Sequence, residues 1–135
     1  MTIYHLSAGA GGIAHMQEMM LANPGNADPL RTSLATGAGA TLMTSRLDRT
    51  GEWHTTPNIG LTVMLKGWLE IHINRAQPKI FTLVAGDMLF VMDLTGEGHR
   101  SRAYGPDGMS ALLLPLKASD LASFGQVFKN WPVRS

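Results

Sequence analysis

The chain has 135 residues and a net charge of +1, with 44% hydrophobic and 16% charged residues, as expected for one compact domain rather than two. A net charge this close to zero does not indicate binding to nucleic acid. The absence of cysteine excludes disulfides and thiolate metal sites. No apolar run approaches the roughly 20 residues of a membrane span, and the first residues make a poor signal peptide, so we expect a cytoplasmic protein with no membrane or nucleic-acid partner.

Residues 1–29 are expected to form an N-terminal arm that precedes a single domain over residues 30–135. Within the arm, the stretch IAHMQEMMLA predicts one short helix, because Ile13, Met16 and Met20 would share a helical face. No carboxylate cluster accompanies the two histidines of the arm, His5 and His15. We therefore expect both on the surface.

From Leu30 onward, short apolar segments alternate with Gly, Pro, Asn and Asp clusters, which predicts strands. The eight expected strands are LRTSLAT, ATLMTSRL, IGLTVMLK, WLEIHI, KIFTLV, MLFVM, HRSRAY and MSALLLPL. Short strands at this spacing are typical of an antiparallel sandwich or barrel. The fold class expected from the residues alone is therefore all-β.

Alternation along the strands predicts which side chains share a face. Leu61, Val63 and Leu65 would line the apolar wall of a pocket. MLFVM (88–92) does not alternate, so both of its faces should be covered, one by the other sheet and one by a second subunit. This run is our reason to expect a homodimer.

The C-terminal stretch ASDLASFGQVF predicts a short closing helix. Leu121, Phe124 and Phe128 would lie on one face of it, behind a possible cap at Ser119.

Two of the five histidines, His54 and His99, stand where a strand meets a polar turn, in GEWHTTPN and DLTGEGHRSR. By alternation His99 and Ser101 share one strand face, and the intervening arginines share the other. A third histidine, His72, alternates with Glu70 on one strand, where a solvated face is a more common arrangement than a ligand pair. His54 and His99 are therefore the candidates for a site at a barrel mouth.

The succession of these segments resembles the cupin family of small jelly-roll barrels, over roughly residues 40–115. Gly67 matches the glycine that ends the family's first block, and Gly86-Asp87 matches the start of the second. His54 and His99 stand at one histidine position of each block. The ending Asp-x-x-Gly-x-Gly-His resembles a subgroup of single-domain cupins with few assigned functions. The resemblance implies a cupin-type jelly-roll barrel, here with the N-terminal arm and the short C-terminal helix.

The resemblance also implies a divalent metal site with four protein positions, of which His54 and His99 keep a ligand. Thr56 and Gly60 occupy the other two positions. Catalytic zinc sites usually take three protein ligands, and non-haem iron sites take two histidines and a carboxylate. A metal would therefore need a carboxylate from elsewhere, and the candidates are Asp93, Glu70 and Glu52.

Two classes of function follow. The first is a protein that binds a small molecule, with His54, Thr56, His99 and Trp53 around the ligand, although packing is the more common use of tryptophan. The second is an enzyme. It would be either a metal-dependent (Fe, Mn, Zn or Ni) oxygenase or isomerase, or a metal-free catalyst in which Asp93 orients His99 as a general base. The fold cannot choose between these classes.

Overall fold

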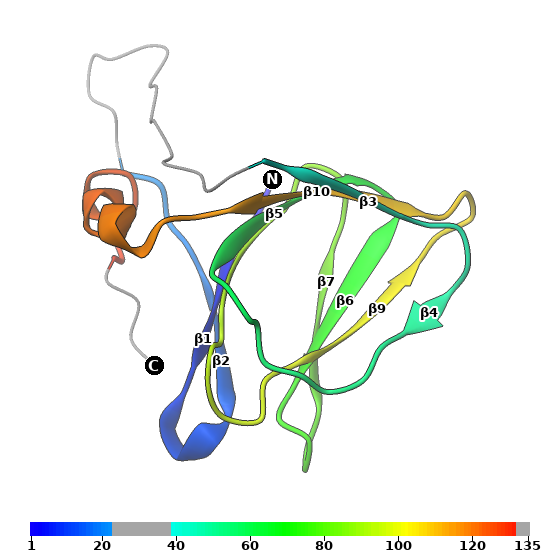
Figure 1. The fold of residues 1–135 in the computed structure, drawn as a ribbon, viewed down its shortest axis with the longest axis horizontal. Helices are drawn as coiled ribbons and strands as arrows, with labels where there is room; N and C mark the ends of the chain where they lie inside the picture. The colour runs from blue at the N-terminus through cyan, green and yellow to red at the C-terminus, as the bar shows by residue number, and fades with distance from the viewer. Residues whose placement is uncertain (23–38, 132–135) are drawn as a thin grey trace.

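The computed structural model describes residues 1–22 and 39–131, which form two β-sheets and two short 3₁₀ helices (Figure 1). The strands are β1 (Ile3–Ala8), β2 (Ala14–Glu18), β3 (Thr41–Ser45), β4 (Arg49–Thr50), β5 (Gly60–Lys66), β6 (Trp68–Ile73), β7 (Lys79–Leu83), β8 (Met88–Met92), β9 (Arg100–Tyr104) and β10 (Met109–Pro115). The helices are η1 (Ala10–Gly12) and η2 (Ala118–Gln126). The all-β class is thus confirmed.

One sheet has six strands in the order β2-β1-β8-β5-β10-β3, and the other has four in the order β4-β9-β6-β7. All pairs are antiparallel except β1 with β8, which is parallel. Seven of the eight expected strands are present, and the eighth, LRTSLAT, lies outside the described residues. The boundary expected at residues 29 and 30 lies outside them as well.

The helix expected at residues 13–22 is wrong, because the chain forms strand β2 there. Ala14 and Met16 also alternate with polar neighbours, and both contact the core between the sheets. Strand β1 pairs with the edge of β8, and β2 then pairs with β1 through the η1 turn. Pairing with an open sheet edge satisfies the backbone of this segment better than an isolated short helix could.

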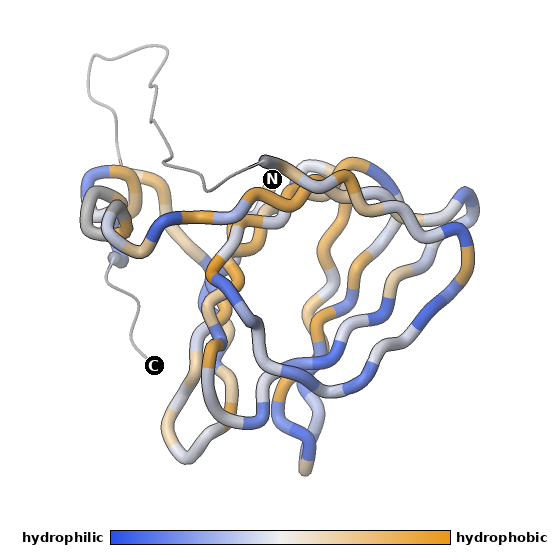
Figure 2. Tube along the Cα trace, in the orientation of Figure 1, coloured by the Kyte–Doolittle hydropathy of each residue, from blue (hydrophilic) through white to orange (hydrophobic). Residues whose placement is uncertain are grey.

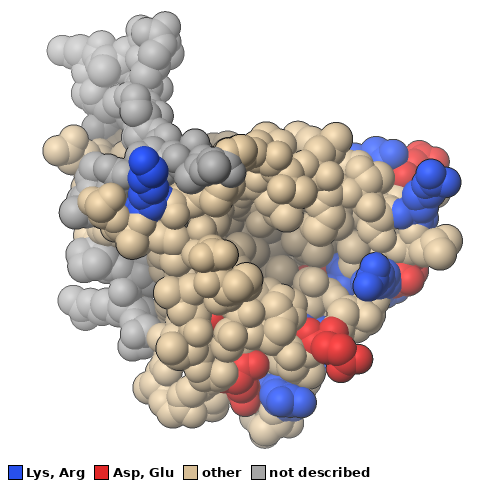
Figure 3. All heavy atoms as spheres, in the orientation of Figure 1, with Lys and Arg blue, Asp and Glu red and all other residues tan. Residues whose placement is uncertain are grey.

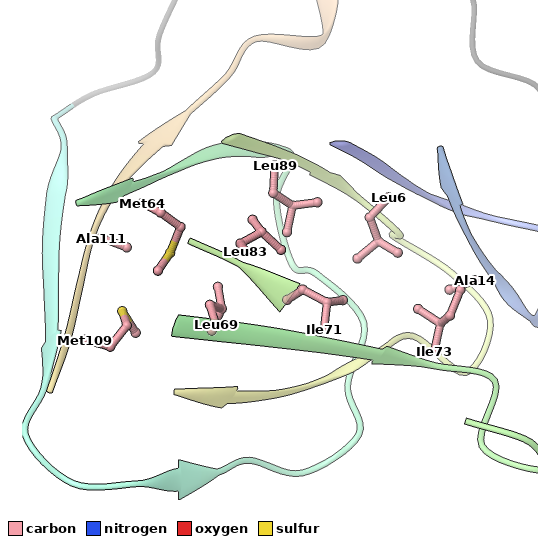
Figure 4. Close-up of a cluster of buried hydrophobic side chains, with 10 residues drawn as sticks. All are labelled: Leu6, Ala14, Met64, Leu69, Ile71, Ile73, Leu83, Leu89, Met109 and Ala111. Atoms are coloured by element: carbon pink, nitrogen blue, oxygen red, sulfur yellow. The ribbon is translucent and has the colours of Figure 1, made fainter. Parts of the chain in front are cut away.

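The main core lies between the two sheets, and Figure 4 shows its side chains pointing into this space from both sides. Its members are Leu6, Ala14, Met64, Leu69, Ile71, Ile73, Leu83, Leu89, Met109 and Ala111. Figure 2 shows the polar residues concentrated in the turns and along the β4 edge. The interior between the sheets is therefore apolar over most of its length.

A second apolar cluster lies on the outer face of the six-stranded sheet. Phe90 of β8 contacts Phe124, Phe128 and Trp131 with ring centroids 5.4 to 6.4 Å apart. Both faces of β8 are covered, as predicted, but the chain's own C-terminal segment covers the second face, not a second subunit. The apolar run of β8 therefore no longer supports a homodimer, which stays a prediction.

The closing helix is present as η2, and Leu121, Phe124 and Phe128 all belong to the second apolar cluster, as their spacing predicted. The residue at the N-cap is Lys117, without a side-chain cap hydrogen bond. Ser119 is two residues further along, inside the helix, so the cap expected there is wrong.

The faces of β5 differ in part from the expected ones. Thr62 and Met64 point between the sheets, and Leu65 is half exposed. Leu61 lines the cavity, as expected, but it also packs with Val63 in the second apolar cluster. Alternation fixes which residues share a face but not which face is inside. Here the C-terminal segment provides a second apolar environment outside the sheet, and the more apolar face of β5 packs against it.

Candidate functional site

The two candidate histidines lie side by side, because their backbones pair directly. The His54 N–H donates to the His99 carbonyl, and the His99 N–H donates to the His54 carbonyl, each at 2.9 Å. Residues directly opposite in an antiparallel pair carry their side chains on the same face. The two imidazole rings accordingly lie 4.6 Å apart between centroids.

The glycines of the 93–99 loop permit this pairing. Gly98 has φ +72°, and a Cβ there would overlap the backbone carbonyl of His54. Gly96 has φ +81° and lies against Gly12 of the N-terminal hairpin, whose carbonyl accepts a hydrogen bond from the Glu97 N–H at 2.8 Å. Only glycine combines this backbone conformation with so close an approach.

Asp93 forms a hydrogen bond with the ring of His99. Its side chain is fully buried, and Oδ2 lies 2.6 Å from Nδ1 of His99. Its backbone carbonyl accepts the Thr56 N–H at 3.1 Å. Within the described residues, the other carboxylate oxygen, Oδ1, has no hydrogen-bond partner. His99 is therefore the hydrogen-bond partner that offsets the burial of this carboxylate. In turn, the carboxylate fixes the orientation of the His99 ring.

The two histidines border a cavity of about 540 Å³ that opens between the sheets. Its polar lining residues are Thr41, His54, Thr56, Asn58, Thr62, His99 and Ser101. The rest of its lining is Met43, Pro57, Ile59, Gly60, Leu61, Leu69, Ile71, Leu89, Val91, Leu113, Leu114 and Pro115. Within residues 1–22 and 39–131, no Lys, Arg, Asp or Glu side chain belongs to this lining. A mostly apolar wall with a few convergent polar groups is typical of a small-molecule site.

Of the residues expected around a ligand, His54, Thr56 and His99 line this cavity together. Trp53 does not line it, which corrects the expectation that it contacts a ligand there. Instead, its ring contacts two guanidinium groups, those of Arg75 at 5.6 Å and Arg100 at 5.2 Å from the ring centroid. The backbone alternation that turns His54 toward the cavity turns its neighbour Trp53 away from it.

The outer face of the four-stranded sheet carries a polar network rather than the solvated pair expected at Glu70 and His72. Both side chains are largely buried, with His72 Nε2 2.9 Å from Glu70 Oε1. Arg100 donates from Nε to His72 Nδ1 at 3.1 Å, and Arg102 approaches Glu70 at 3.4 Å.

The rim of this network is exposed. Arg102 also donates to Asp48, with Nη2 2.6 Å from Oδ2. Hydrogen bonds from His72 and then from Tyr104 hold the pKa of Glu70 below its usual value. In Figure 3 most charged side chains of the visible face lie along its lower and right edges, and one basic side chain lies at the upper left.

The side chains at the cavity do not fit the metal ion that the cupin resemblance implies. His54 and His99 supply two nitrogens, one short of the usual three protein ligands. Asp93 lies behind His99, Glu70 lies on the outer sheet face, and Glu52 is exposed, with its backbone carbonyl on His54. Within residues 1–22 and 39–131, no group of three or more His, Cys, Asp or Glu side chains could hold a metal.

Sequence reasoning missed part of the cavity wall. Ser101 was expected beside His99 and does line the cavity, but Thr62 and Asn58 were not expected there. Thr62 could have been found by assigning the less apolar face of β5 to the interior. Asn58 lies in the turn before β5 and gives no periodic signal.

No family model matches this chain, and no curated protein sequence matches it. Among solved structures, 65% of the chain is similar to 68% of a conserved Streptococcus pyogenes protein of unknown function, with 18% identity and a TM-score of 0.44. The chain is also similar to hydroxypropylphosphonic acid epoxidase from S. wedmorenis over 57% of its length, with 13% identity and a TM-score of 0.42. It spans 42% of that epoxidase. Both similarities are compatible with the two-sheet fold and say nothing of what this chain binds.

The part of the chain that the structure describes also lacks any helix with the length and apolar character needed to cross a membrane.

Proposed function

We propose that this chain is a cupin-type jelly-roll domain that binds a small molecule in the cavity beside His54 and His99. The observation that carries the proposal is the cavity of about 540 Å³, lined mostly by apolar residues and bordered by two imidazoles side by side. The apolar wall would supply affinity and the polar groups would orient the ligand.

The ligand is expected to be uncharged. Among the described residues, no Lys, Arg, Asp or Glu side chain lines the cavity, and transfer of an ion into an apolar pocket without a countercharge is strongly unfavourable. The titratable side chains that the described part of the chain places on the wall are His54 and His99.

A catalytic role for His99 with Asp93 stays a prediction within this proposal. Asp93 would hold the ring with one nitrogen toward the cavity, and its charge would stabilise the imidazolium that forms when His99 accepts a proton. Thr56, beside the pair, could donate a hydrogen bond to a ligand oxygen.

The experiment is a thermal-shift screen of uncharged metabolites on the wild type and two tryptophan variants. Asn58→Trp fills the exposed edge of the cavity, and Gln77→Trp adds the same side chain at an exposed site elsewhere. We expect ligands that raise the Tm of the wild type and of Gln77→Trp, but not of Asn58→Trp. Ligands that raise the Tm of all three equally would contradict the proposed site.

Elemental mass spectrometry on protein purified without a tag or chelator provides a second check. We expect less than stoichiometric iron, manganese, zinc and nickel, because the two histidines lack a third ligand. Stoichiometric metal that is lost in His54→Ala would instead support a metal-dependent cupin enzyme.

The protein is also proposed to be a homodimer. Trp68 and Ile80 lie exposed on the outer face of the four-stranded sheet, 37% and 55% accessible, and could be covered by a second copy. Size-exclusion chromatography with light scattering should give twice the chain mass, and a clean monomer would exclude the dimer.

A further inference from the structure

The hydrogen bonds of the two histidines determine which ring nitrogen carries the proton. Nδ1 of His54 lies 2.9 Å from the backbone carbonyl of Glu52. A carbonyl oxygen can only accept a hydrogen bond, so Nδ1 must be the protonated nitrogen. In neutral His54 the other nitrogen, Nε2, is therefore an acceptor.

The same argument applies to His99. Its Nδ1 lies 2.6 Å from Oδ2 of Asp93, and an ionised carboxylate is also only an acceptor. Neutral His99 therefore carries its proton on Nδ1, and Nε2, on the opposite side of the ring, is left as an acceptor toward the cavity that this residue lines.

Two acceptor nitrogens thus lie close together on one wall. The rings are 4.6 Å apart between centroids and inclined at 55°, and neither Nε2 has a hydrogen-bond partner among the described residues. Neither ring can donate to the other in this tautomeric state. His54 is exposed, so these nitrogens are open to solvent in the free protein. A bound molecule that covers them must bring donors of its own, because an acceptor covered without a donor loses its hydrogen bond to water.

We propose, on the basis of the proposed function, that the ligand is an uncharged molecule with an apolar body and two adjacent hydroxyl groups. One hydroxyl donates to Nε2 of His54 and the other to Nε2 of His99. The apolar body contacts the aliphatic wall that includes Leu69 and Val91. An anion is disfavoured by the two lone pairs, and an organic cation finds no carboxylate to pair with among the described lining residues.

His72 provides an internal reference for the tautomers. Arg100 donates to its Nδ1, and its Nε2 lies on Glu70. Neutral His72 must therefore carry its proton on Nε2, the reverse of the two cavity histidines.

The first test measures the tautomers directly. Long-range ¹H–¹⁵N spectra at about pH 8, where an ordinary histidine is neutral, should show Nε2 unprotonated in His54 and His99 and protonated in His72. A proton on Nε2 of either cavity histidine would overturn the inference, because that nitrogen could not accept a hydroxyl.

The second test uses three probes that differ only in methylation: trans-1,2-cyclohexanediol, its monomethyl ether and its dimethyl ether. Each methylation should weaken binding by about fivefold to tenfold, the range for one neutral hydrogen bond. In His54→Ala the first methylation should have little effect, whereas in His15→Ala, a histidine outside this cavity, the full series should persist.

The outcomes separate the two proposals. If the dimethyl ether binds as tightly as the diol, the donor inference fails while the small-molecule site stands. If none of the probes shifts backbone resonances of the cavity wall, the inference fails for hydroxylic ligands, and the metabolite screen alone decides the proposed function. A stepwise loss that depends on His54 supports both.

Discussion

Two buried histidine–carboxylate pairs in this domain have similar contacts and different surroundings. His99 and Asp93 lie 2.6 Å apart beside the cavity, and His72 and Glu70 lie 2.9 Å apart on the outer face of the four-stranded sheet. All four side chains are largely withdrawn from solvent.

The pairs differ in what surrounds them. Glu70 has Arg102 and Tyr104 in addition to its histidine, and both nitrogens of His72 are engaged. Among the described residues, the side chain of Asp93 is paired with His99 through one oxygen, and its other oxygen has no hydrogen-bond partner. The outer pair is part of a saturated network, while the inner pair leaves one nitrogen and one oxygen unused.

This difference distinguishes a structural pair from a functional one better than distance or burial does. A histidine whose two nitrogens are both hydrogen-bonded to the protein can neither bind a ligand nor exchange a proton without breaking a contact. A histidine held through one nitrogen is oriented and still free to act through the other. By this criterion we propose His99 as the functional member of the two pairs and His72 as the structural one.

The largest difference in stability is expected between two variants, each of which removes the histidine of one pair. His99→Ala leaves the Asp93 carboxylate buried without a partner, which should cost about 4 kcal/mol of unfolding free energy. His72→Ala leaves Glu70 with Arg102 and Tyr104 and should cost about 1 kcal/mol. Urea denaturation measures both.

A control removes the charge together with its partner. The double variant Asp93→Leu/His99→Leu should recover most of the loss of His99→Ala, because replacing both partners with apolar groups leaves nothing unpaired. Equal losses in the two single alanine variants would contradict the proposed difference between the pairs.

A third buried histidine, His5, extends the comparison, because no carboxylate of the described residues is paired with it. Its Nε2 lies 3.1 Å from the sulfur of Met92, its ring is 5.2 Å from that of Trp131, and its Nδ1 has no partner within the described residues. Burial first, and then the proximity of His15, lower the pKa of His5 from 6.5 to about 4. The expectation of a surface position for His5 was therefore wrong.

This lowered pKa predicts a loss of stability in acid. The folded state keeps His5 neutral, while the unfolded chain takes up the proton below about pH 6.5. The contribution is therefore complete above pH 6.5 and is lost as the pH falls toward 4, by about 3 kcal/mol in all. His5→Phe should remove this part of the pH dependence, as measured by urea denaturation at several pH values. The same pH dependence in the variant and the wild type would contradict it.

The sequence predicted the strands well because their signals are local. Gly, Pro and Asn punctuation marks the ends of strands such as β6 and β8, and these signals need no knowledge of the rest of the chain. Strand β2 was missed because Met16 fits a helical face with Ile13 and Met20 as well as a strand face with Ala14. The open edge beside β1, which decided between them, is a property of the assembled sheet.

Part of the site was also predictable from local sequence signals. His54 and His99 were found because each ends a polar turn, and His99 and Ser101 were assigned one face by alternation. The structure adds facts that depend on contacts distant in sequence. Glu70 and His72 are buried because arginines from β9 cover them, and no single-strand pattern carries that information.

The smallest effect we expect tests the loop that joins the two histidines without changing either ring. Gly98→Ala and Gly86→Ala both place a Cβ at positive φ, +72° and +91°, which alone should cost about 1 kcal/mol. At Gly86 nothing lies within 4 Å of the added atom, whereas at Gly98 it overlaps the His54 carbonyl. Gly98→Ala should therefore cost about 2 kcal/mol more than Gly86→Ala in urea denaturation. It should also separate the His54 and His99 rings, so that diol binding falls in Gly98→Ala and persists in Gly86→Ala. Equal stability of the two variants, with diol binding intact in both, would mean that the site does not depend on the backbone pairing of its two histidines.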